Sequence, residues 1–276
     1  MSGTGVPGGR AVRWYQPVAA PSPLDRVLAC SWSAQPSGRH RLVPDACIDL
    51  LWLSTGSILL CGPEATAWTF QLPEGVTAAG VRFRPGVLPA LLGLDAQVVA
   101  DRLVPWREVA GEAAERSLLE RLAAAPDEAA RMAVLEQEAA ALVASAADPD
   151  PFAEAVVELV TRHPRVKAPT VAAAVGLTTR QLHRRCLSSF GYGLSTLARI
   201  VRFHRFWSVA ELAPHGTSLA TLAHEAGYTD HAHLVRDCRA ITGSPPGRFL
   251  AESFATFPDM SDPYKTGRNF AGTLAR

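Results

Sequence analysis

The sequence lacks the features that mark membrane, secreted and disulfide-stabilised proteins. No apolar run approaches the ~18 uncharged residues that a membrane-spanning helix needs. The first ten residues, MSGTGVPGGR, contain no apolar core of the kind that a signal peptide requires. The five cysteines, at positions 30, 47, 61, 186 and 238, form neither a CxxC pair nor a regular disulfide framework. These absences predict a reduced, cytoplasmic protein without a cofactor or a metal site.

The small net charge of +1 conceals an uneven distribution. Residues 1–150 contain 12 lysines and arginines against 17 acidic residues, whereas residues 151–255 contain 12 against 7. Because neutralisation of phosphates supplies most non-specific affinity for DNA, a basic segment beside an acidic one fits a DNA-binding domain joined to a separate sensor. At 276 residues the chain is long enough for two domains, each with its own core.

The most informative segment, residues 218–250, predicts two short helices joined by a tight turn. Its first apolar residues recur at helical spacing: Leu219, Leu222, Ala223 and Ala226. Gly227 then supplies the free backbone that ends a helix, and Thr229 and Asp230 offer oxygens that cap the next one. This pattern is typical of a helix-turn-helix, whose second helix enters the major groove of DNA.

The same pattern occurs about fifty residues earlier, in residues 169–190. Here Gly176 follows an apolar face, and Thr178 or Thr179 can cap a second helix. Two such units in tandem form an internal repeat. We expect helix 151–164 to brace the first unit and helix 195–213 to connect the two. That connection is ~28 Å long at 1.5 Å per residue, so it can hold the recognition helices about one DNA turn (~34 Å) apart.

On these residues the chain resembles the AraC/XylS family of bacterial transcriptional regulators over about 151–250. The family pattern consists of A-x-x-x-G-[FY], then a recognition helix, then G-x-x-P-x-x-[FY]. In this chain the pattern is matched by Ala223, Gly227, Tyr228, Gly243, Pro246 and Phe249. The chain departs from the family in Leu234 and Cys238, which replace a usual aromatic pair, and in Leu194, where proline is common. The resemblance implies a regulator that binds promoter DNA and acts on RNA polymerase, as an activator rather than a repressor.

The exposed starts of the two recognition helices are the candidate readers of base edges, since such helices enter the groove by their N-terminal residues. Arginine can bond guanine and glutamine can bond adenine through two hydrogen bonds each. The expected base contacts are Arg180, Gln181, His183, Arg184, His231, Ala232, His233 and Arg236. The expected phosphate contacts are Lys167, Thr178, Thr179, Arg185, Thr229 and Arg239.

The connecting helix carries both packing and outward-facing residues. We expect Arg199, Arg202 and Arg205 to point outward into solvent. His204 and Trp207 are expected to pack between elements rather than to contact DNA.

The N-terminal half has short segments of strand character at 47–53, 57–62, 67–72 and 79–85, bounded by turn-forming residues. Residues 1–23 are rich in glycine and proline and are expected to be loop-like. Helical patterns follow at 87–94 and 112–147, where Pro126 divides the second pattern and Asp127 starts its second helix. The phrases LVPDACIDLLW and GVRFRPG resemble a poorly characterised effector domain that precedes this DNA-binding module in related regulators.

The predicted fold class is therefore α+β: a small β-rich, sandwich-like or barrel-like domain with following helices, and an all-α tandem helix-turn-helix domain. The predicted divisions are an N-terminal segment (1–23), an effector or dimerisation domain (24–148), a DNA-binding domain (149–255) and a tail (256–276).

The candidates for an effector pocket are Asp45, Cys47, Asp49, Trp52, Arg82 and Arg84. Alternating residues share a strand face, and a charged group that points into a β-domain can orient a small polar ligand. The alternatives are that these charges form a salt bridge at the rim or face water, and that Trp52 belongs to the aromatic core. Cys30, Cys47 and Cys61 with His40 could in principle form a metal or redox site, but buried free cysteines commonly act as small apolar residues.

The sequence thus predicts a non-enzymatic, sequence-specific DNA-binding transcription regulator with a small-molecule effector in its N-terminal domain. One alternative is a ligand-free regulator whose N-terminal domain only forms a homodimer. Another is a cysteine-based covalent or metal sensor fused to the same DNA-binding module.

Overall fold

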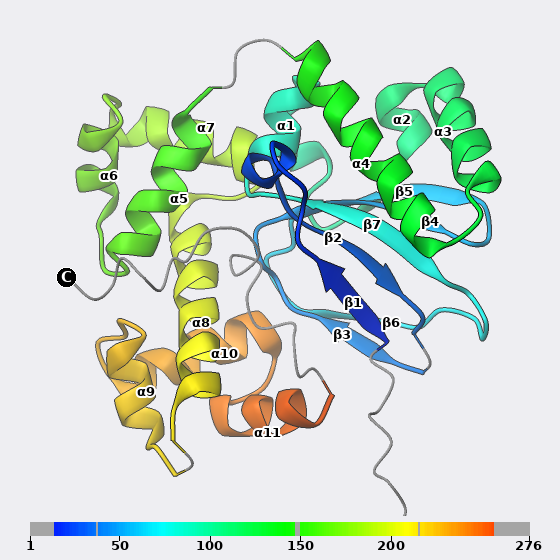
Figure 1. Ribbon diagram of the computed structural model, residues 1–276. Coiled ribbons are helices and arrows are strands. Elements are labelled where there is room, and N and C mark those ends of the chain that lie inside the picture. Colours follow the sequence, from blue (N-terminus) through cyan, green and yellow to red (C-terminus); the bar gives the residue numbers. More distant parts are fainter. Residues whose placement is uncertain (1–13, 37, 147–149, 215, 257–276) are drawn as a thin grey trace, which may run out of the picture.

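The computed structural model describes residues 14–36, 38–146, 150–214 and 216–256, which form a β-rich N-terminal part with following helices and a helical C-terminal part (Figure 1). The predicted α+β class is confirmed. Residues 1–13, 37, 147–149, 215 and the part of the predicted tail from residue 257 lie outside the described residues.

Six antiparallel strands form one sheet in the order β1-β2-β7-β4-β5-β8. Their bounds are β1 Tyr15–Val18, β2 Leu28–Ala34, β4 Ile48–Leu53, β5 Ser57–Cys61, β7 Ala78–Phe83 and β8 Leu103–Pro105. A second, two-stranded sheet pairs β3 (His40–Leu42) with β6 (Trp68–Phe70). The four predicted strands are confirmed as β4, β5, β6 and β7. The main sheet is open, because β1 and β8 form its edges.

The prediction that residues 1–23 are loop-like is wrong for Tyr15–Val18, which pair with β2. β2 itself was not predicted, since its sequence LACSWSA lacks the β-branched residues typical of strands. All seven of its residues are nevertheless buried. Burial of Ser31 is compensated by a hydrogen bond from its hydroxyl to the carboxylate of Glu136, a partner that no local pattern reveals.

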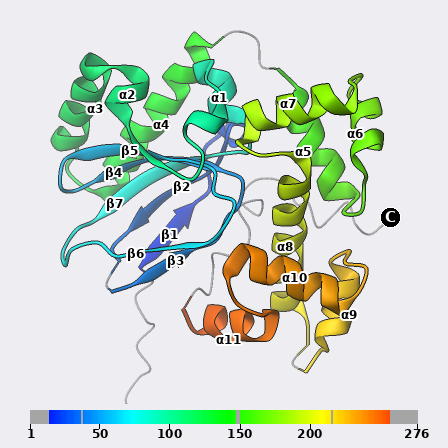
Figure 2. The same ribbon diagram turned by 180° about the vertical axis from the view of Figure 1, so that it is seen from behind.

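One face of the sheet, formed by residues such as Leu50 and Val81, packs under helices to make the main hydrophobic core (Figure 2). The covering helices are α1 (Val87–Leu92), α2 (Trp106–Ala110), α3 (Glu112–Ala124) and α4 (Glu128–Ser145). Asp127 caps α4 by accepting a hydrogen bond from the Ala130 N–H, as predicted. Short 3₁₀ helices occur at η1 (Leu24–Arg26) and η2 (Ala96–Val98).

The C-terminal helices form the predicted tandem arrangement. They are α5 Phe152–Arg162, α6 Ala168–Ala174, α7 Thr179–Phe190, α8 Leu194–Leu212, α9 Leu219–Glu225, α10 His231–Thr242 and α11 Pro246–Thr256. The first unit consists of α6 and α7, the second of α9 and α10, and α8 connects them (Figure 1). None of the helices in the described part of the chain is long and apolar enough to span a membrane.

The connecting helix α8 belongs to the cores of both units. Its first half contributes Leu197 and Ile200 to the core of the first unit. Its second half contributes Phe203 and Trp207 to the core of the second, where their rings lie 5.1 and 4.9 Å from the ring of Phe249. The aromatic position of the family pattern therefore fixes α11 on α8, and edge-to-face aromatic packing of this kind stabilises beyond the area buried.

The prediction that Arg202 points outward is wrong. Its side chain is only 12% exposed and donates to the Asp237 carboxylate at 2.8 Å and to the Pro164 carbonyl at 2.9 Å. Helical spacing places Arg202 away from the apolar residues of α8, but its partner Asp237 lies on another helix. Arg199 and Arg205 are half-buried, whereas the predicted packing of His204 and Trp207 is confirmed by their burial.

Candidate nucleic-acid interface

The start of the first recognition helix, α7, is fixed by a capping box. The Thr178 hydroxyl accepts the Gln181 backbone N–H at 3.3 Å, and Gln181 Oε1 accepts the Thr178 backbone N–H at 2.8 Å. This reciprocal pair satisfies two N–H groups that have no partner within the helix. The predicted adenine contact of Gln181 needs both ends of its amide, so it would compete with the cap.

The other predicted base contacts of α7 are exposed on its outer surface: Arg180, His183 and Arg184. Within the described residues, neither Arg180 nor Arg184 forms an ion pair. Their positive charges are therefore available for a polyanion. The His183 ring lies against Gly193, where a Cβ would be only 3.1 Å from it.

In the second unit, Asp230 caps α10 by accepting the His233 backbone N–H at 2.6 Å. His231, Ala232 and Arg236 are exposed, as a base-reading role requires. His233 differs, because its Nε2 lies 3.4 Å from the Asp237 carboxylate and its side chain is only 28% exposed.

The surroundings of His233 give it a role inside the domain. Its ring packs edge-on against Tyr228, with centroids 5.1 Å apart. Burial lowers the pKa of His233, although the Asp237 carboxylate opposes this effect. The predicted base contact of His233 is therefore the least favoured of the eight.

Five of the six predicted phosphate contacts are exposed: Lys167, Thr178, Thr179, Thr229 and Arg239. Arg185 is the exception, since its guanidinium pairs with Asp150 and lies 4.0 Å from the centre of the Phe152 ring. Its charge is already compensated at the start of α5, so the structure does not favour a phosphate contact there.

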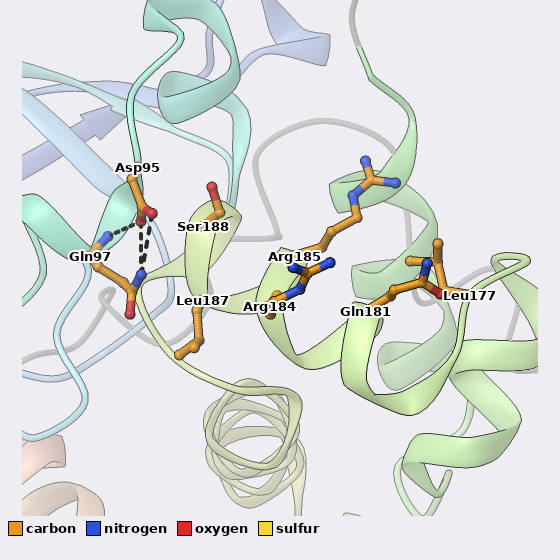
Figure 3. Close-up of a pocket in the computed structure, with 8 residues that line it drawn as sticks. All are labelled: Asp95, Gln97, Leu177, Gln181, Arg184, Arg185, Leu187 and Ser188. Atoms are coloured by element: carbon orange, nitrogen blue, oxygen red, sulfur yellow. Dashed lines mark hydrogen bonds between the residues drawn. The ribbon is translucent and has the colours of Figure 1, made fainter.

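A groove along α7 brings the N-terminal domain beside the first recognition helix (Figure 3). The helix and the turn before it supply Leu177, Gln181, Arg184, Arg185, Leu187 and Ser188, and the N-terminal domain supplies Asp95 and Gln97. Asp95 caps η2 by accepting the Gln97 N–H at 2.9 Å. Sequence reasoning missed these two residues, since nothing local to them signals contact with a helix about ninety positions later.

The loop of residues 62–67, which follows β5, contacts the C-terminal ends of both recognition helices. At α7, a Cβ on Gly191 would lie 3.2 Å from Pro63 Cγ and 2.8 Å from Ala100 Cβ, so the two surfaces meet closely. At α10, the Ala67 N–H donates to the Ile241 carbonyl at 2.6 Å. The N-terminal domain thus contacts both units while the starts of their recognition helices remain exposed.

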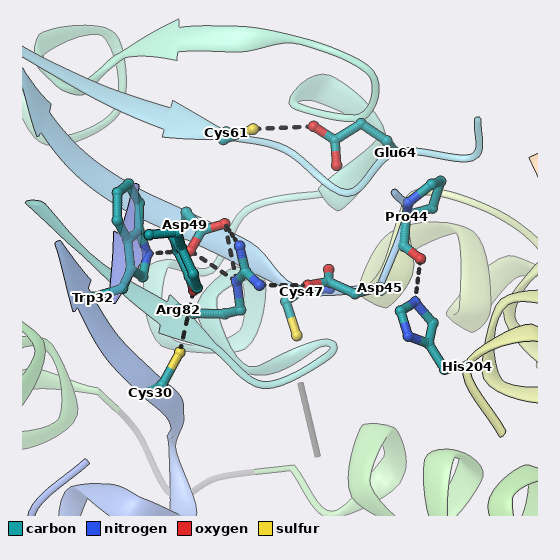
Figure 4. A network of polar contacts seen from close by, with 11 residues as sticks. Cys30, Trp32, Pro44, Asp45, Cys47, Asp49, Cys61, Glu64, Arg82 and His204 are labelled. Atoms are coloured by element: carbon teal, nitrogen blue, oxygen red, sulfur yellow. Dashed lines mark hydrogen bonds and ion pairs between the residues drawn. The ribbon is translucent and has the colours of Figure 1, made fainter. Parts of the chain in front are cut away.

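A buried ion-pair network occupies the second face of the sheet (Figure 4). Arg82 donates to Asp49 through Nε and one terminal nitrogen at 3.0 Å, and its other terminal nitrogen lies 3.0 Å from Asp45. Trp32 Nε1 donates to Asp49 at 2.8 Å. Cys47 lies in the same network through its backbone N–H, which donates to Asp45 at 2.9 Å. The structure therefore brings together four of the six predicted pocket residues.

The other two pocket candidates, Trp52 and Arg84, lie away from this network. Strand alternation places Trp52 on the opposite, helix-covered face, where the Arg131 guanidinium lies 5.1 Å from its ring centre. Arg84 follows the end of β7, and its Nε donates to the Asp25 carbonyl at 3.0 Å.

Glu64, in the 62–67 loop, is a member of this polar region that sequence reasoning missed. Its Oε1 accepts the Cys61 thiol at 3.0 Å and Trp68 Nε1 at 3.1 Å. Burial raises the pKa of Glu64 to about 7, and the nearby carboxylates of Asp45 and Asp49 add to this effect.

A small cavity lies between this network and the connecting helix. The sheet and its loops supply Leu42, Val43, Asp45, Asp49, Cys61, Glu64 and Arg82, and α8 supplies His204 and Trp207. His204 Nε2 donates to the Pro44 carbonyl at 2.6 Å, which ties α8 to the N-terminal domain (Figure 4). The cavity is thus bordered by groups from both parts of the chain.

The five cysteines are free and buried. Burial raises the pKa of Cys30, Cys47 and Cys61, which keeps each of them in the less reactive thiol form. Among the described residues, no group of three or more histidine, cysteine and acidic side chains could hold a metal ion. The surroundings of these cysteines therefore do not favour the thiolate-sensor alternative.

Two family models match separate parts of the chain. Residues 171–252, which span both units, match a helix-turn-helix domain, and residues 16–105 match a domain of unknown function, DUF6597. The C-terminal part is thus an AraC-type helix-turn-helix domain, as its motifs indicate, and such a domain binds DNA.

The chain also aligns with solved structures of ToxT from Vibrio cholerae. An apo form is 10% identical, with 80% of this chain and 96% of the ToxT chain covered and a TM-score of 0.47. A form bound to an unsaturated fatty acid is 11% identical, with 81% and 94% covered and a TM-score of 0.44. None of the curated protein sequences compared with the chain matches it.

Proposed function

We propose that the protein is a transcription regulator that binds promoter DNA sequence-specifically through both helix-turn-helix units. The observation that carries this proposal is the tandem itself. Two recognition helices, joined by the 19-residue helix α8, present exposed basic residues at their starts. A helix of that length suits two successive major-groove segments on one face of DNA.

In this proposal the two units read different bases, because their exposed residues differ. Arg180 and Arg184 of α7 offer two guanine-bonding side chains, whereas α10 offers Arg236 and His231 beside the small side chain of Ala232. Lys167 and Arg239 would neutralise phosphates on either side. The operator is then asymmetric, with no requirement for a palindrome.

Regulation would act through the N-terminal domain, since its 62–67 loop contacts the C-terminal ends of both recognition helices. A small-molecule effector that binds one arrangement of the two parts better than another would change the affinity for DNA. Recruitment of RNA polymerase as an activator, action in the cytoplasm and the absence of an enzymatic step are inferred from the AraC resemblance.

A second candidate role for the N-terminal domain is homodimerisation. The sheet has edge strands β1 and β8, and the half-exposed side chains of Val18 and Leu103 lie on them. Unpaired strand edges can pair with a second chain. Measurement of the molar mass in solution, at concentrations that bracket those used for DNA binding, tests this role.

Selection of bound sequences from a random DNA pool tests the DNA-binding proposal. The full-length protein should enrich a motif of two blocks about 10 base pairs apart. Arg184→Ala should relax sequence preference in one block only, and Arg236→Ala in the other. Arg107→Ala, which removes an exposed arginine of the N-terminal domain, is the matched control and should leave both blocks intact.

A motif of one block, or equal effects of Arg184→Ala and Arg236→Ala on the same block, would contradict the tandem proposal. Loss of both blocks in the control would show that overall charge, rather than base reading, produced the enrichment.

A further inference from the structure

We propose that Arg165 is a positioning residue for DNA reading. It links the turn of the second helix-turn-helix unit to the first unit, and this link fixes the separation of the two DNA segments that are read. The contacts of Arg165 are a feature of the structure, whereas their consequence for DNA rests on the proposed function.

Arg165 lies in the loop of residues 163–167, between α5 and α6, and this loop is anchored in the first unit. Val166 packs against the hydrophobic core of that unit. The Val166 backbone N–H also donates to the His163 carbonyl at 2.8 Å, which closes the loop on the end of α5. The backbone that carries Arg165 therefore moves with the first unit.

The Arg165 side chain reaches from this loop to the turn between α9 and α10. Its Nε donates to the Gly227 carbonyl at 3.0 Å, and one terminal nitrogen donates to the Tyr228 carbonyl at 2.7 Å. Both carbonyls lie just before Asp230, which caps α10. Because a guanidinium presents its donors in a rigid plane, two such bonds fix the orientation of the turn as well as its distance. Arg165 thus holds the segment from which the second recognition helix starts.

The glycine in this turn shows how closely the two units approach. Gly176 and Gly227 follow the first helix of their units, and both have positive φ, +67° and +90°. A Cβ built on Gly227 would lie only 2.7 Å from Pro164 Cβ, whereas no atom lies within 4 Å of a Cβ built on Gly176. Of the two turns, only that of the second unit therefore needs glycine for a contact with the other unit.

A second, largely buried link starts from the same loop. Arg202 of α8 donates to the Pro164 carbonyl at 2.9 Å and to the Asp237 carboxylate of α10 at 2.8 Å. The loop, the connecting helix and the second recognition helix are joined through this one guanidinium. Arg165 adds an attachment at the surface, on the turn itself.

These attachments matter because α8 alone does not fix the angle between the units. A long helix can bend gently, and a unit that packs on one helix can rotate about it. An attachment away from the helix axis opposes that rotation. One base pair turns the second DNA block by about one-tenth of a helical turn, so a small rotation of the second unit is enough to change the preferred spacing. Arg165 therefore restricts the tandem to one spacing of its two blocks.

Fluorescence anisotropy with the full-length protein tests this restriction on three DNA duplexes. They carry the two selected blocks at the selected spacing, or with one base pair inserted or removed between them. Either change should lower the affinity of the parent protein about tenfold or more, since one block is then displaced from its recognition helix. In Arg165→Ala the loss should shrink to about threefold, because the second unit can adjust its position.

Two further variants separate positioning from charge. Arg165→Lys keeps the charge but lacks the planar pair of donors, so it should lose the spacing preference as Arg165→Ala does. Arg162→Ala removes a neighbouring exposed arginine that pairs with Glu158, and it should keep the preference of the parent protein. Equal weakening at all three spacings in Arg165→Ala, with recovery in Arg165→Lys, would show that Arg165 only contacts a phosphate and would overturn the proposal.

A distance measurement without DNA tests the link itself. Spin labels are attached to Ala174→Cys on α6 and Ala240→Cys on α10, two exposed positions, while the native cysteines are buried. Pulsed electron paramagnetic resonance of the full-length protein should give one narrow distribution of distances between the labels. Arg165→Ala should broaden this distribution, and Arg162→Ala should leave it unchanged.

An unchanged distribution in Arg165→Ala, or retention of the parent spacing preference in that variant, would overturn the proposal. Absence of a two-block motif in the DNA selection would instead contradict the DNA-binding proposal. Because the distance measurement uses no DNA, the two failures are distinguishable.

Discussion

A single buried ion pair holds the second recognition helix against the connecting helix. Arg202 of α8 and Asp237 of α10 form an ion pair in which both side chains are about one-tenth exposed. The Arg202 guanidinium also lies 5.1 Å from the centre of the Tyr228 ring. This pair fixes the second recognition helix on the connecting helix, and the loss of one partner leaves the other buried without compensation.

Asp237→Asn should therefore lower the free energy of unfolding by about 3 kcal/mol. Urea unfolding followed by circular dichroism measures the change. The matched control is Glu158→Gln, which breaks an exposed pair with Arg162 and should cost about 0.5 kcal/mol or less. Similar losses of unfolding free energy in the two variants would show that the buried Arg202–Asp237 pair stabilises the fold no more than the exposed pair does.

Glu64 should make stability depend on pH. Burial raises its pKa from the ordinary value of 4.5 to about 7, so between these pH values the folded protein keeps a proton that the unfolded chain has lost. The contribution of this proton to stability is present below pH 4.5 and is lost as the pH rises to 7.

Glu64→Gln should consequently be more stable than the parent protein at pH 8, by about 1 to 2 kcal/mol, and should show little gain at pH 4.5. Unfolding in urea at the two pH values measures the difference, with Glu74→Gln as reference. A gain of the same size at both pH values would argue against a raised pKa in the folded state.

At the level of secondary-structure elements, glycines that follow helices have two different roles. Gly176 and Gly191 both have positive φ, +67° and +78°. No atom lies within 4 Å of a Cβ built on Gly176, whereas a Cβ on Gly191 would contact the N-terminal domain. Gly176 only turns the chain inside the first unit, while Gly191 also allows two parts of the protein to approach.

Gly191→Ala should therefore destabilise the protein more than Gly176→Ala. Both changes cost about 1 kcal/mol because of the left-handed backbone. Only Gly191→Ala should also speed hydrogen exchange in the 62–67 loop, since its methyl group would displace Pro63 and Ala100. Thermal unfolding and hydrogen exchange measure the two effects, and equal results for both variants would mean that this contact is not maintained in solution.

The sequence predicted elements well where the signal is local. The break between α3 and α4 and the starts of α7 and α10 follow from Pro126, Asp127, Thr178 and Asp230. β2 could not be predicted in this way, because its buried Ser31 is satisfied by a partner distant in the chain, Glu136. Local patterns report capping and periodicity, but they contain no information on such partners.

On the scale of the whole molecule, the basic C-terminal domain should make DNA binding strongly dependent on salt. Each phosphate contact contributes a slope of about −0.9 to the logarithm of affinity against the logarithm of salt concentration. Not every arginine contributes, because some are already paired within the protein.

Arg239→Ala should reduce the magnitude of this slope by about 1, whereas Arg185→Ala should leave the slope nearly unchanged. The reason is that Arg239 is exposed, while Arg185 is already paired with Asp150. Fluorescence anisotropy titrations of labelled DNA between about 50 and 200 mM salt test the contrast. A reduced slope for Arg185→Ala would mean that the pair with Asp150 opens when DNA binds.

The amino-acid order was sufficient to predict the tandem helix-turn-helix units, because caps, turn glycines and apolar spacing act within one or two helical turns. It also identified the candidate base readers, most of which are exposed. Tertiary structure alone assigned Arg185, Arg202 and His233 to internal partners and placed Glu64 beside Asp45, Asp49 and α8. Such assignments depend on which distant surfaces meet, and a buried charge is stable only where folding supplies its partner.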